Sequence, residues 1–187
     1  MAVRTLLLIR HGQYHLEQEH DRYGQLTPLG QRQTKRLARR LAQYPIDVLH
    51  SSTAPRALET VELIGRHLPE VPRRRTPLLL EGLPGVLKGM TKEQRGRVPL
   101  HRARMDRAFA RYFRPTRGRD RFEVLICHGN IIRYLLRKAL GDSIDKWSRS
   151  ETTHCGMSIV LIEADGSTRI SAVNDVGHLP RKMQTFQ

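Results

Sequence analysis

The sequence has 187 residues, of which 39% are hydrophobic and 27% charged; it predicts one folded domain over 1–187 and excludes intrinsic disorder. Lysine and arginine number 33 against 18 acidic residues, so the net charge of +15 favours negatively charged partners such as phosphate groups or acidic surfaces. No apolar run approaches the roughly 18 residues that a membrane-spanning helix needs.

The first third of the sequence predicts two strand–helix units. The first strand is a β-branched apolar run that ends abruptly at the polar turn Arg10-His11-Gly12. Thr27 and Pro28 are typical of the first residues of a helix, as are Thr53-Ala54-Pro55. The predicted elements are a strand over 3–9, a helix over about 28–43, a strand over 46–50 and a helix over 53–68.

The remaining elements alternate in the same way, with an unusual segment between them. Residues 81–99 are rich in glycine with proline near both ends, which predicts an irregular segment that could act as a lid. Asp165-Gly166 between two apolar runs predicts a hairpin, whereas the arginines at 73–75 and 114–121 are typical of solvated loops. The predicted elements are a strand over 78–80, a helical face from Met105 to Tyr112, a strand over 122–127, a helix over 132–139, and hairpin strands over 157–162 and 168–173.

Strands that alternate with helices predict an α/β fold with three α/β/α layers and a mostly parallel central sheet. Ligands of such sheets bind outside the carboxyl ends of the strands. Five chemically capable side chains follow predicted strands and are expected to meet in one crevice, namely Arg10, His11, Arg56, Glu81 and His128.

These five side chains supply what phosphoryl transfer requires. A neutral His11 can attack phosphorus, because histidine titrates near about 6.5. Arg10, Arg56 and His128 can bind the phosphoryl oxygens, and the N-terminus of the helix after Pro55 adds a favourable field. Glu81 is the natural proton donor for the leaving group. Neither a metal nor a cofactor is required by this arrangement.

Each residue also has a structural interpretation. His11, His128 and Glu81 could be held by hydrogen bonds without touching a substrate, and Arg56 could pair with carboxylates of its own helix at Glu59 or Glu62. A cation in the first turn of a helix is unfavourable unless an anion lies nearby, which favours phosphate binding by Arg56.

Six motifs in order resemble the signature of the histidine phosphatase (phosphoglycerate-mutase-like) superfamily. They are Leu-Leu-Ile-Arg-His-Gly at 7–12, Leu-Thr-Pro-Leu-Gly at 26–30, His-Ser-Ser at 50–52, Arg-Ala-Leu-Glu-Thr at 56–60, Glu-Gly at 81–82 and Cys-His-Gly-Asn at 127–130. The resemblance implies the phosphoglycerate-mutase-like fold, His11 as nucleophile, Arg10, Arg56 and His128 as phosphate ligands, and Glu81 as proton donor.

The sequence looks most like the mitochondrial protein-serine/threonine phosphatase branch of that superfamily. Arg-His-Gly-Gln-Tyr-His at 10–15, Arg-His-Leu-Pro at 66–69 and Ile-Cys-His at 126–128 resemble segments of this branch. The branch carries an N-terminal membrane anchor that this sequence does not show, and His154 stands where the superfamily often has asparagine.

The leading hypothesis is therefore a metal-independent phosphomonoester hydrolase that acts through phosphohistidine on phosphoserine or phosphothreonine proteins. A phosphatase of sugar phosphates or nucleotides, or a weak mutase, is the alternative on the same fold. A noncatalytic polyanion-binding module is the alternative outside it. Only 5% of residues are aromatic and no basic run is interleaved with stacking residues, so nucleic acid is not an expected partner.

Several further residues receive weaker assignments. Gln13, Tyr14 and His15 follow the nucleophile and could contact substrate or lie in a solvated loop, and of these Gln13 is assigned to substrate binding. His178 resembles a residue of the superfamily's tail and is not assigned to the site, and neither His15 nor His20 has metal-ligand spacing. Cys127 is expected to be a buried, inert thiol. The sequence has only two cysteines, Cys127 and Cys155, which fits a reducing compartment, and a cytoplasmic protein is expected. A homo-oligomer is left open.

Overall fold

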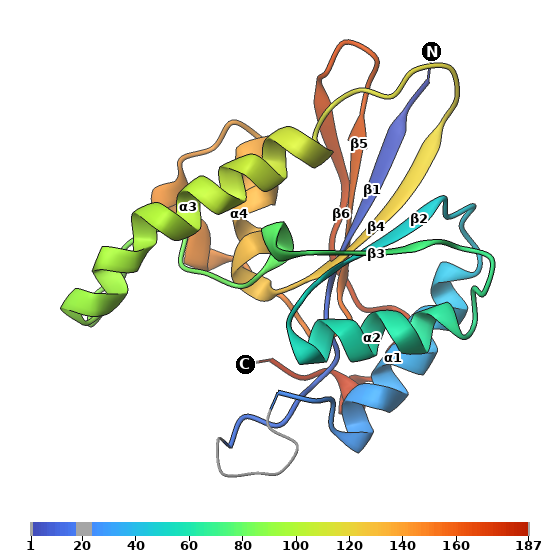
Figure 1. The fold of residues 1–187 in the computed structure, drawn as a ribbon, viewed down its shortest axis with the longest axis horizontal. Helices are drawn as coiled ribbons and strands as arrows, with labels where there is room; N and C mark the ends of the chain where they lie inside the picture. Colours follow the sequence, from blue (N-terminus) through green and yellow to red (C-terminus); the bar gives the residue numbers. More distant parts are fainter. Residues whose placement is uncertain (1, 18–23, 187) are drawn as a thin grey trace.

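The computed structural model describes residues 2–17 and 24–186, in which strands and helices alternate along the chain (Figure 1). These elements are β1 (Arg4–Arg10), α1 (Pro28–Leu41), β2 (Val48–Ser52), α2 (Pro55–Gly65), β3 (Arg73–Thr76), α3 (Lys92–Tyr112), β4 (Arg121–Cys127), α4 (Gly129–Ala139), β5 (Met157–Ile162) and β6 (Thr168–Asp175). The alternation confirms the α/β class.

The strands form one six-stranded sheet in the order β3-β2-β4-β1-β5-β6. β1 pairs in parallel with β4, from Arg4 opposite Arg121 to Arg10 opposite Cys127. β2 is parallel to both β3 and β4, whereas β5 is antiparallel to β1 and to β6. The β5–β6 pair is the predicted hairpin, and the sheet is mostly parallel, as expected.

Helices cover both faces of the sheet, which gives three layers (Figure 1). Alternate residues of β1 point to opposite sides, so Leu6 and Leu8 pack in the cluster with α3 and α4, whereas Leu7 and Ile9 pack with α1 and α2. Both clusters consist mainly of buried aliphatic side chains. This packing holds the carboxyl ends of β1 and β4 in fixed positions beside each other.

The loop after β1 packs tightly against the start of α1. Thr27 caps the helix by accepting a hydrogen bond from the amide of Gly30 over 3.0 Å. A Cβ atom on Gly30 would lie 2.0 Å from the carbonyl oxygen of Gln13, and one on Gly12 would lie 2.8 Å from the carbonyl oxygen of Gly30. Glycine at both positions therefore lets α1 support the loop that carries His11.

Two predictions around β3 were wrong. Residues 78–80 do not form a strand, because Pro77–Leu79 is a turn of 3₁₀ helix in which Thr76 accepts a hydrogen bond from the amide of Leu78 over 3.2 Å. Leu79 is fully buried in the core cluster below α3. The strand is instead the arginine run at 73–76, which lies at the sheet edge and is exposed, so it lacks the apolar pattern of a buried strand.

The irregular segment predicted over 81–99 is shorter than expected. It ends at Thr91, whose hydroxyl accepts from the amide of Gln94 while the Gln94 side chain accepts from the amide of Thr91. This reciprocal cap starts α3 at Lys92, and Pro99 lies inside the helix instead of ending the loop. The single domain predicted over 1–187 stays a prediction, although residues 4–175 contribute strands to one sheet.

Candidate active site

The site is built at the carboxyl ends of the parallel strands. His11 follows β1 and His128 follows β4, and because these strands are neighbours the two imidazole ring centroids lie 5.0 Å apart. β2 ends at Ser52, close to the start of α2, whose second residue is Arg56. The three motifs are therefore brought together by strand order, as the expected α/β fold requires.

His11 is held in the tautomer that a nucleophile needs. Its Nδ1 lies 2.8 Å from the carbonyl oxygen of Gly12, which can only accept a hydrogen bond, so Nδ1 carries the proton. Its Nε2 accepts a hydrogen bond from the Nε of Arg56 over 3.0 Å and therefore carries a lone pair. Burial, followed by the neighbouring His128 and Arg56, lowers the pKa of His11 well below 6.5. The ring is neutral at pH 7.

Arg56 faces His11 and does not pair with its own helix. Glu59 accepts hydrogen bonds from the amide of Leu26 and the side chain of Gln31, at 2.8 and 3.0 Å. The other helix carboxylate, Glu62, pairs with two arginines of β3. The guanidinium of Arg56 instead lies over the Tyr14 ring, 4.6 Å from its centroid.

His128 and Arg10 are the buried neighbours of His11 in the site. His128 is fully buried, and its Nε2 lies 2.8 Å from the hydroxyl of Ser52. Burial and the charges of Arg56 and Arg10 lower the pKa of His128 well below 6.5, so this ring is also neutral. Arg10 is 6% exposed and donates to the carbonyl oxygen of Thr152 over 2.6 Å, which anchors its guanidinium beside the two histidines.

Glu81 reaches the site from the loop between the 3₁₀ turn and α3. Its Oε1 accepts from the amide of Gly82 over 3.2 Å, and Arg104 of α3 holds the loop by donating to the carbonyl oxygens of Leu80 and Glu81 at 2.9 and 2.6 Å. Burial raises the pKa of the Glu81 carboxyl above 4.5, and the charges of Arg10 and Arg56 oppose this rise without reversing it. A carboxyl with a raised pKa is suited to donating a proton.

His154 is the site residue that sequence reasoning did not assign. Its ring centroid lies 5.5 Å from that of His11, and its Nδ1 lies 2.9 Å from the hydroxyl of Thr185. Burial and the charge of Arg10 lower the pKa of His154 to about 3. The only sequence signal was a histidine where the resembled superfamily often has asparagine.

Three buried polar atoms in this region have no hydrogen-bond partner within residues 2–17 and 24–186. They are Nδ1 of His128, Nε2 of His154 and Oγ1 of Thr152. Unpaired buried polar atoms are costly, and two of the three belong to imidazoles whose ring centroids lie 5.0 and 5.5 Å from that of His11, which is typical of a site that a polar ligand fills. A phosphoryl oxygen accepts a hydrogen bond from such an atom when the atom carries a hydrogen.

Other residues named from the sequence lie in less direct positions. The side-chain oxygen of Gln13 accepts from Thr27 over 2.8 Å, so it supports the α1 cap, and its substrate contact stays a prediction. His178 lines a pocket beside α1 with Arg36 and Arg40. His15 is half-buried and His20 lies outside the described residues. Cys127 is fully buried, which raises the pKa of its thiol and agrees with an inert side chain.

Arginines supply positive charge in this region. In the described part of the chain, no group of three or more His, Cys, Asp or Glu side chains is arranged to hold a metal ion. No helix there is long and apolar enough to cross a membrane.

A family model described as histidine phosphatase superfamily (branch 1) matches residues 6–118 and 101–176. The chain belongs to the histidine phosphatase superfamily. It is 35% identical over 194 residues to the serine/threonine-protein phosphatase Pgam5, mitochondrial, of Caenorhabditis elegans, a match that covers 99% of this chain and 67% of the relative. The corresponding human phosphatase is 33% identical over 188 residues, covering 96% of this chain and 65% of the relative. The chain therefore spans about two thirds of these relatives' length.

Solved structures place this histidine phosphatase among phosphoglycerate-mutase-like folds. The crystal structure of phosphoglycerate mutase from Plasmodium falciparum superposes with a TM-score of 0.68 at 26% identity, covering 97% of this chain and 96% of that one. The resemblance drawn from the six motifs is confirmed, as is the assignment to a hydrolase family. The cytoplasmic assignment was wrong by this comparison, because the relatives are named as mitochondrial. Two free cysteines fit any reducing compartment and do not distinguish one from another.

Proposed function

We propose that this chain hydrolyses phosphoserine and phosphothreonine in proteins through a phosphohistidine on His11, without a metal ion. The observation that carries the proposal is the pair of opposed hydrogen bonds to the His11 ring, which leave a lone pair on Nε2 directly in front of the Arg56 guanidinium. A nucleophile and a cation that face each other in this way are suited to receive a phosphoryl group between them.

In the first step the lone pair of His11 Nε2 attacks phosphorus, and the bond from phosphorus to the serine or threonine oxygen breaks. Glu81 donates its proton to the leaving oxygen, because an alkoxide is a poor leaving group. Arg10, Arg56 and neutral His128 donate hydrogen bonds to the equatorial oxygens, where negative charge is concentrated. The products are an alcohol side chain and phosphohistidine.

In the second step the Glu81 carboxylate accepts a proton from water as the water oxygen attacks phosphorus. The bond between phosphorus and Nε2 breaks, inorganic phosphate leaves, and His11 returns to the neutral tautomer that Gly12 specifies. Glu81 is protonated again, so the cycle closes without an external acid or base. Its raised pKa supports both roles, because the carboxyl keeps its proton to a higher pH than an ordinary glutamate and is a stronger base once ionised.

The substrate class is proposed from the relatives, which are named as serine/threonine-protein phosphatases. The likeness to a phosphoglycerate mutase favours a small phosphomonoester as the second candidate. The two candidates differ in the relative kcat/KM for a phosphoserine peptide and for 3-phosphoglycerate or a sugar phosphate. A clear preference for the peptide supports the protein substrate, and a clear preference for the metabolite contradicts it.

The chemistry is tested by comparing His11→Ala with His67→Ala. His67 is exposed near the C-terminal end of α2, so the control removes an imidazole outside the site. We expect hydrolysis of phosphopeptide and aryl phosphate to disappear in His11→Ala and to be unchanged in His67→Ala. Retained hydrolysis in folded His11→Ala contradicts the proposal.

A further inference from the structure

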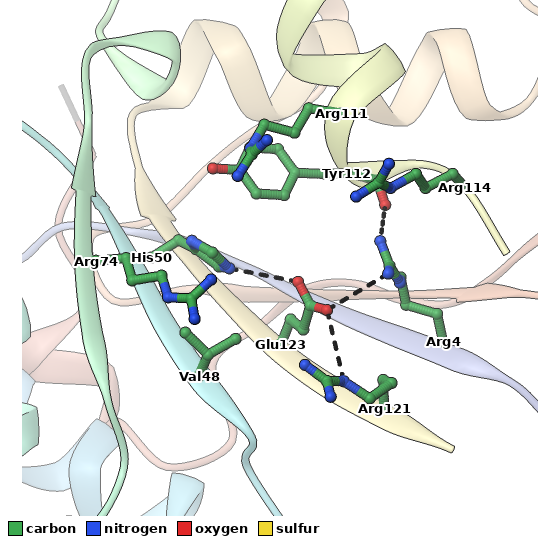
Figure 2. A pocket seen from close by; sticks show the side chains of 9 residues that line it. All are labelled: Arg4, Val48, His50, Arg74, Arg111, Tyr112, Arg114, Arg121 and Glu123. Atoms are coloured by element: carbon green, nitrogen blue, oxygen red, sulfur yellow. Dashed lines mark hydrogen bonds and ion pairs between the residues drawn. The ribbon is translucent and has the colours of Figure 1, made fainter. Parts of the chain in front are cut away.

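A second basic region lies at the opposite end of the parallel strands from His11. A cavity of about 140 Å³ lies at the amino ends of β1 and β4. Figure 2 shows the side chains that line it, which include Arg4, Arg74, Arg111, Arg114, Arg121 and Glu123. A second cavity, which shares Arg74 and Arg111 with the first, continues along β3, and a third shares Arg4 and Arg114. We call these three cavities, which share lining residues, the arginine groove.

The groove has far more positive than negative charge. Glu123 forms long ion pairs with Arg4 and Arg121, at 3.7 and 3.9 Å, and its other oxygen lies 3.3 Å from Nε2 of His50. Within the described residues, no carboxylate lies at ion-pair distance from Arg74, Arg111 or Arg114, which surround the cavity (Figure 2). Three planar guanidinium groups are thus available to an anionic ligand.

The edge strand β3 supplies the groove with an open backbone edge as well as arginine side chains. Arg73 and Arg75 pair with Glu62 of α2 on one face of the sheet, at 3.3 and 3.2 Å. Because side chains alternate along a strand, Arg74 lies on the other face, where it lines the same cavity as Arg111, and Arg75 also borders the cavity along β3. In the described part of the chain β3 pairs only with β2, so its outer backbone groups are open to another strand.

We propose that the arginine groove binds an acidic segment of a partner protein. Its carboxylates would pair with Arg74, Arg111 and Arg114, while its backbone adds a strand beside β3. Successive arginines on β3 repel a second copy of the same strand and attract an acidic one, so charge selects the partner.

The observations favour a polypeptide over nucleic acid. Tyr112 is the one Tyr, Phe or Trp among the described residues that line the groove, and it is only 3% exposed, so bases have no stacking surface. The open backbone edge of β3 can also form a ladder of hydrogen bonds with a peptide backbone, which a phosphodiester chain cannot form. The Arg4 end of the groove is separated from His11 by the length of β1, about 20 Å at 3.3 Å per residue. The β3 end lies closer along the strand direction, because Arg74 pairs with His50 of β2 and is level with Leu8 of β1.

The probe is a fluorescein-labelled twelve-residue peptide that alternates glutamate and threonine, since alternation places its carboxylates on one face of an added strand. Its affinity is measured by fluorescence anisotropy at low salt for the wild-type chain, for Arg74→Glu/Arg111→Glu, and for Arg66→Glu/Arg95→Glu. The last variant has the same net charge change at exposed positions outside the groove. Arg74→Gln/Arg111→Gln serves if the charge reversal prevents folding, which circular dichroism reports.

We expect the groove variant to bind at least tenfold more weakly than wild type and the control to stay within twofold. N-methylation of alternate peptide amides removes their hydrogen-bond donors. It should weaken binding to the wild-type chain if the peptide adds a strand beside β3. Equal losses in both double variants, or no binding to wild type, overturn the proposal. Stronger binding of a single-stranded oligonucleotide of equal charge also overturns it. Phosphatase activity on an aryl phosphate, measured in parallel, reports the site at His11 separately from the groove.

Discussion

Arg56 donates its Nε hydrogen to Nε2 of His11 over 3.0 Å, and this contact joins the first turn of α2 to the end of β1. The contact fixes the nucleophilic nitrogen by placing a donor against it while Gly12 accepts from the other ring nitrogen. The same guanidinium lies over Tyr14, so its position is set on two sides. In the proposed mechanism, Arg56 is therefore prepositioned to bind the phosphoryl group that arrives at Nε2.

We predict that Arg56→Ala lowers kcat/KM by on the order of 10² or more, because it removes a charge-assisted contact to the transferring oxygens. Arg56→Lys should stay substantially impaired, since a lysine keeps the charge and loses the planar fork. Steady-state kinetics, vanadate inhibition and thermal melting measure these effects. Arg66→Ala, at the exposed far end of the same helix, is the matched control. Normal catalysis and vanadate affinity in Arg56→Ala would remove Arg56 from the site.

Glu81→Gln should reduce activity on phosphoserine much more than on an aryl phosphate, whose leaving group needs little protonation. General acid catalysis contributes about 10² to 10⁴ in rate. In single-turnover phosphorylation, the wild-type rate on phosphoserine should fall as pH rises through the pKa of Glu81, which burial raises above 4.5, because the required proton is then lost. The phosphorylation rate of Glu81→Gln should not show this fall as pH rises. Equal losses on both substrates would assign Glu81 a structural role instead.

The buried histidines predict that acid destabilises the fold. Burial lowers the pKa of His154 to about 3, whereas in the unfolded chain it titrates near 6.5. Below pH 6.5 the unfolded state therefore binds more protons than the folded state. As the pH is lowered, the free energy of unfolding decreases by up to about 1.4 kcal/mol per pH unit for one such group. The slope of the unfolding free energy against pH, measured by urea titrations between pH 6.5 and 5, reports the protons taken up on unfolding. His154→Asn should reduce this uptake by about one proton. The exposed His67→Asn should leave it unchanged, and an unchanged slope in His154→Asn would contradict this account.

Chelation should leave activity intact, because arginine and histidine donors stabilise the phosphoryl oxygens in the proposed mechanism. The measurement is the phosphopeptide rate after dialysis against excess EDTA, with and without added Mg²⁺, Mn²⁺ or Zn²⁺. Loss of activity that a divalent metal restores would show that the proposed residues are insufficient.

The elements that carry the site could be predicted from the sequence because each has a strong local signal. Apolar runs that end in Arg10-His11-Gly12 and in Cys127-His128-Gly129 marked two buried strands with polar ends, and Thr27-Pro28 marked a capped helix. The rule that ligands bind at carboxyl ends then placed His11 beside His128.

The sequence did not reveal features that depend on tertiary contacts. The arginine run of β3 lacks apolar alternation because an edge strand can be exposed, and Pro99 was taken as a boundary although α3 continues through it. His154 reaches His11 only because the segment before β5 folds back over the end of β1, where the amide of Cys155 donates to the carbonyl oxygen of Arg10 over 2.9 Å. No local pattern encodes such a long-range approach.

The most direct test of the central claim is to trap the phosphoenzyme. Protein mixed with excess ³²P-labelled phosphopeptide is quenched within milliseconds in alkali, under which phosphoramidates survive, and the label is located by peptide mapping. We predict acid-labile, base-stable label on the peptide that contains His11, its accumulation in Glu81→Gln when an aryl phosphate is the donor, and its absence in His11→Ala. Label that persists in His11→Ala, or turnover by wild type with no label on this peptide, would contradict the mechanism.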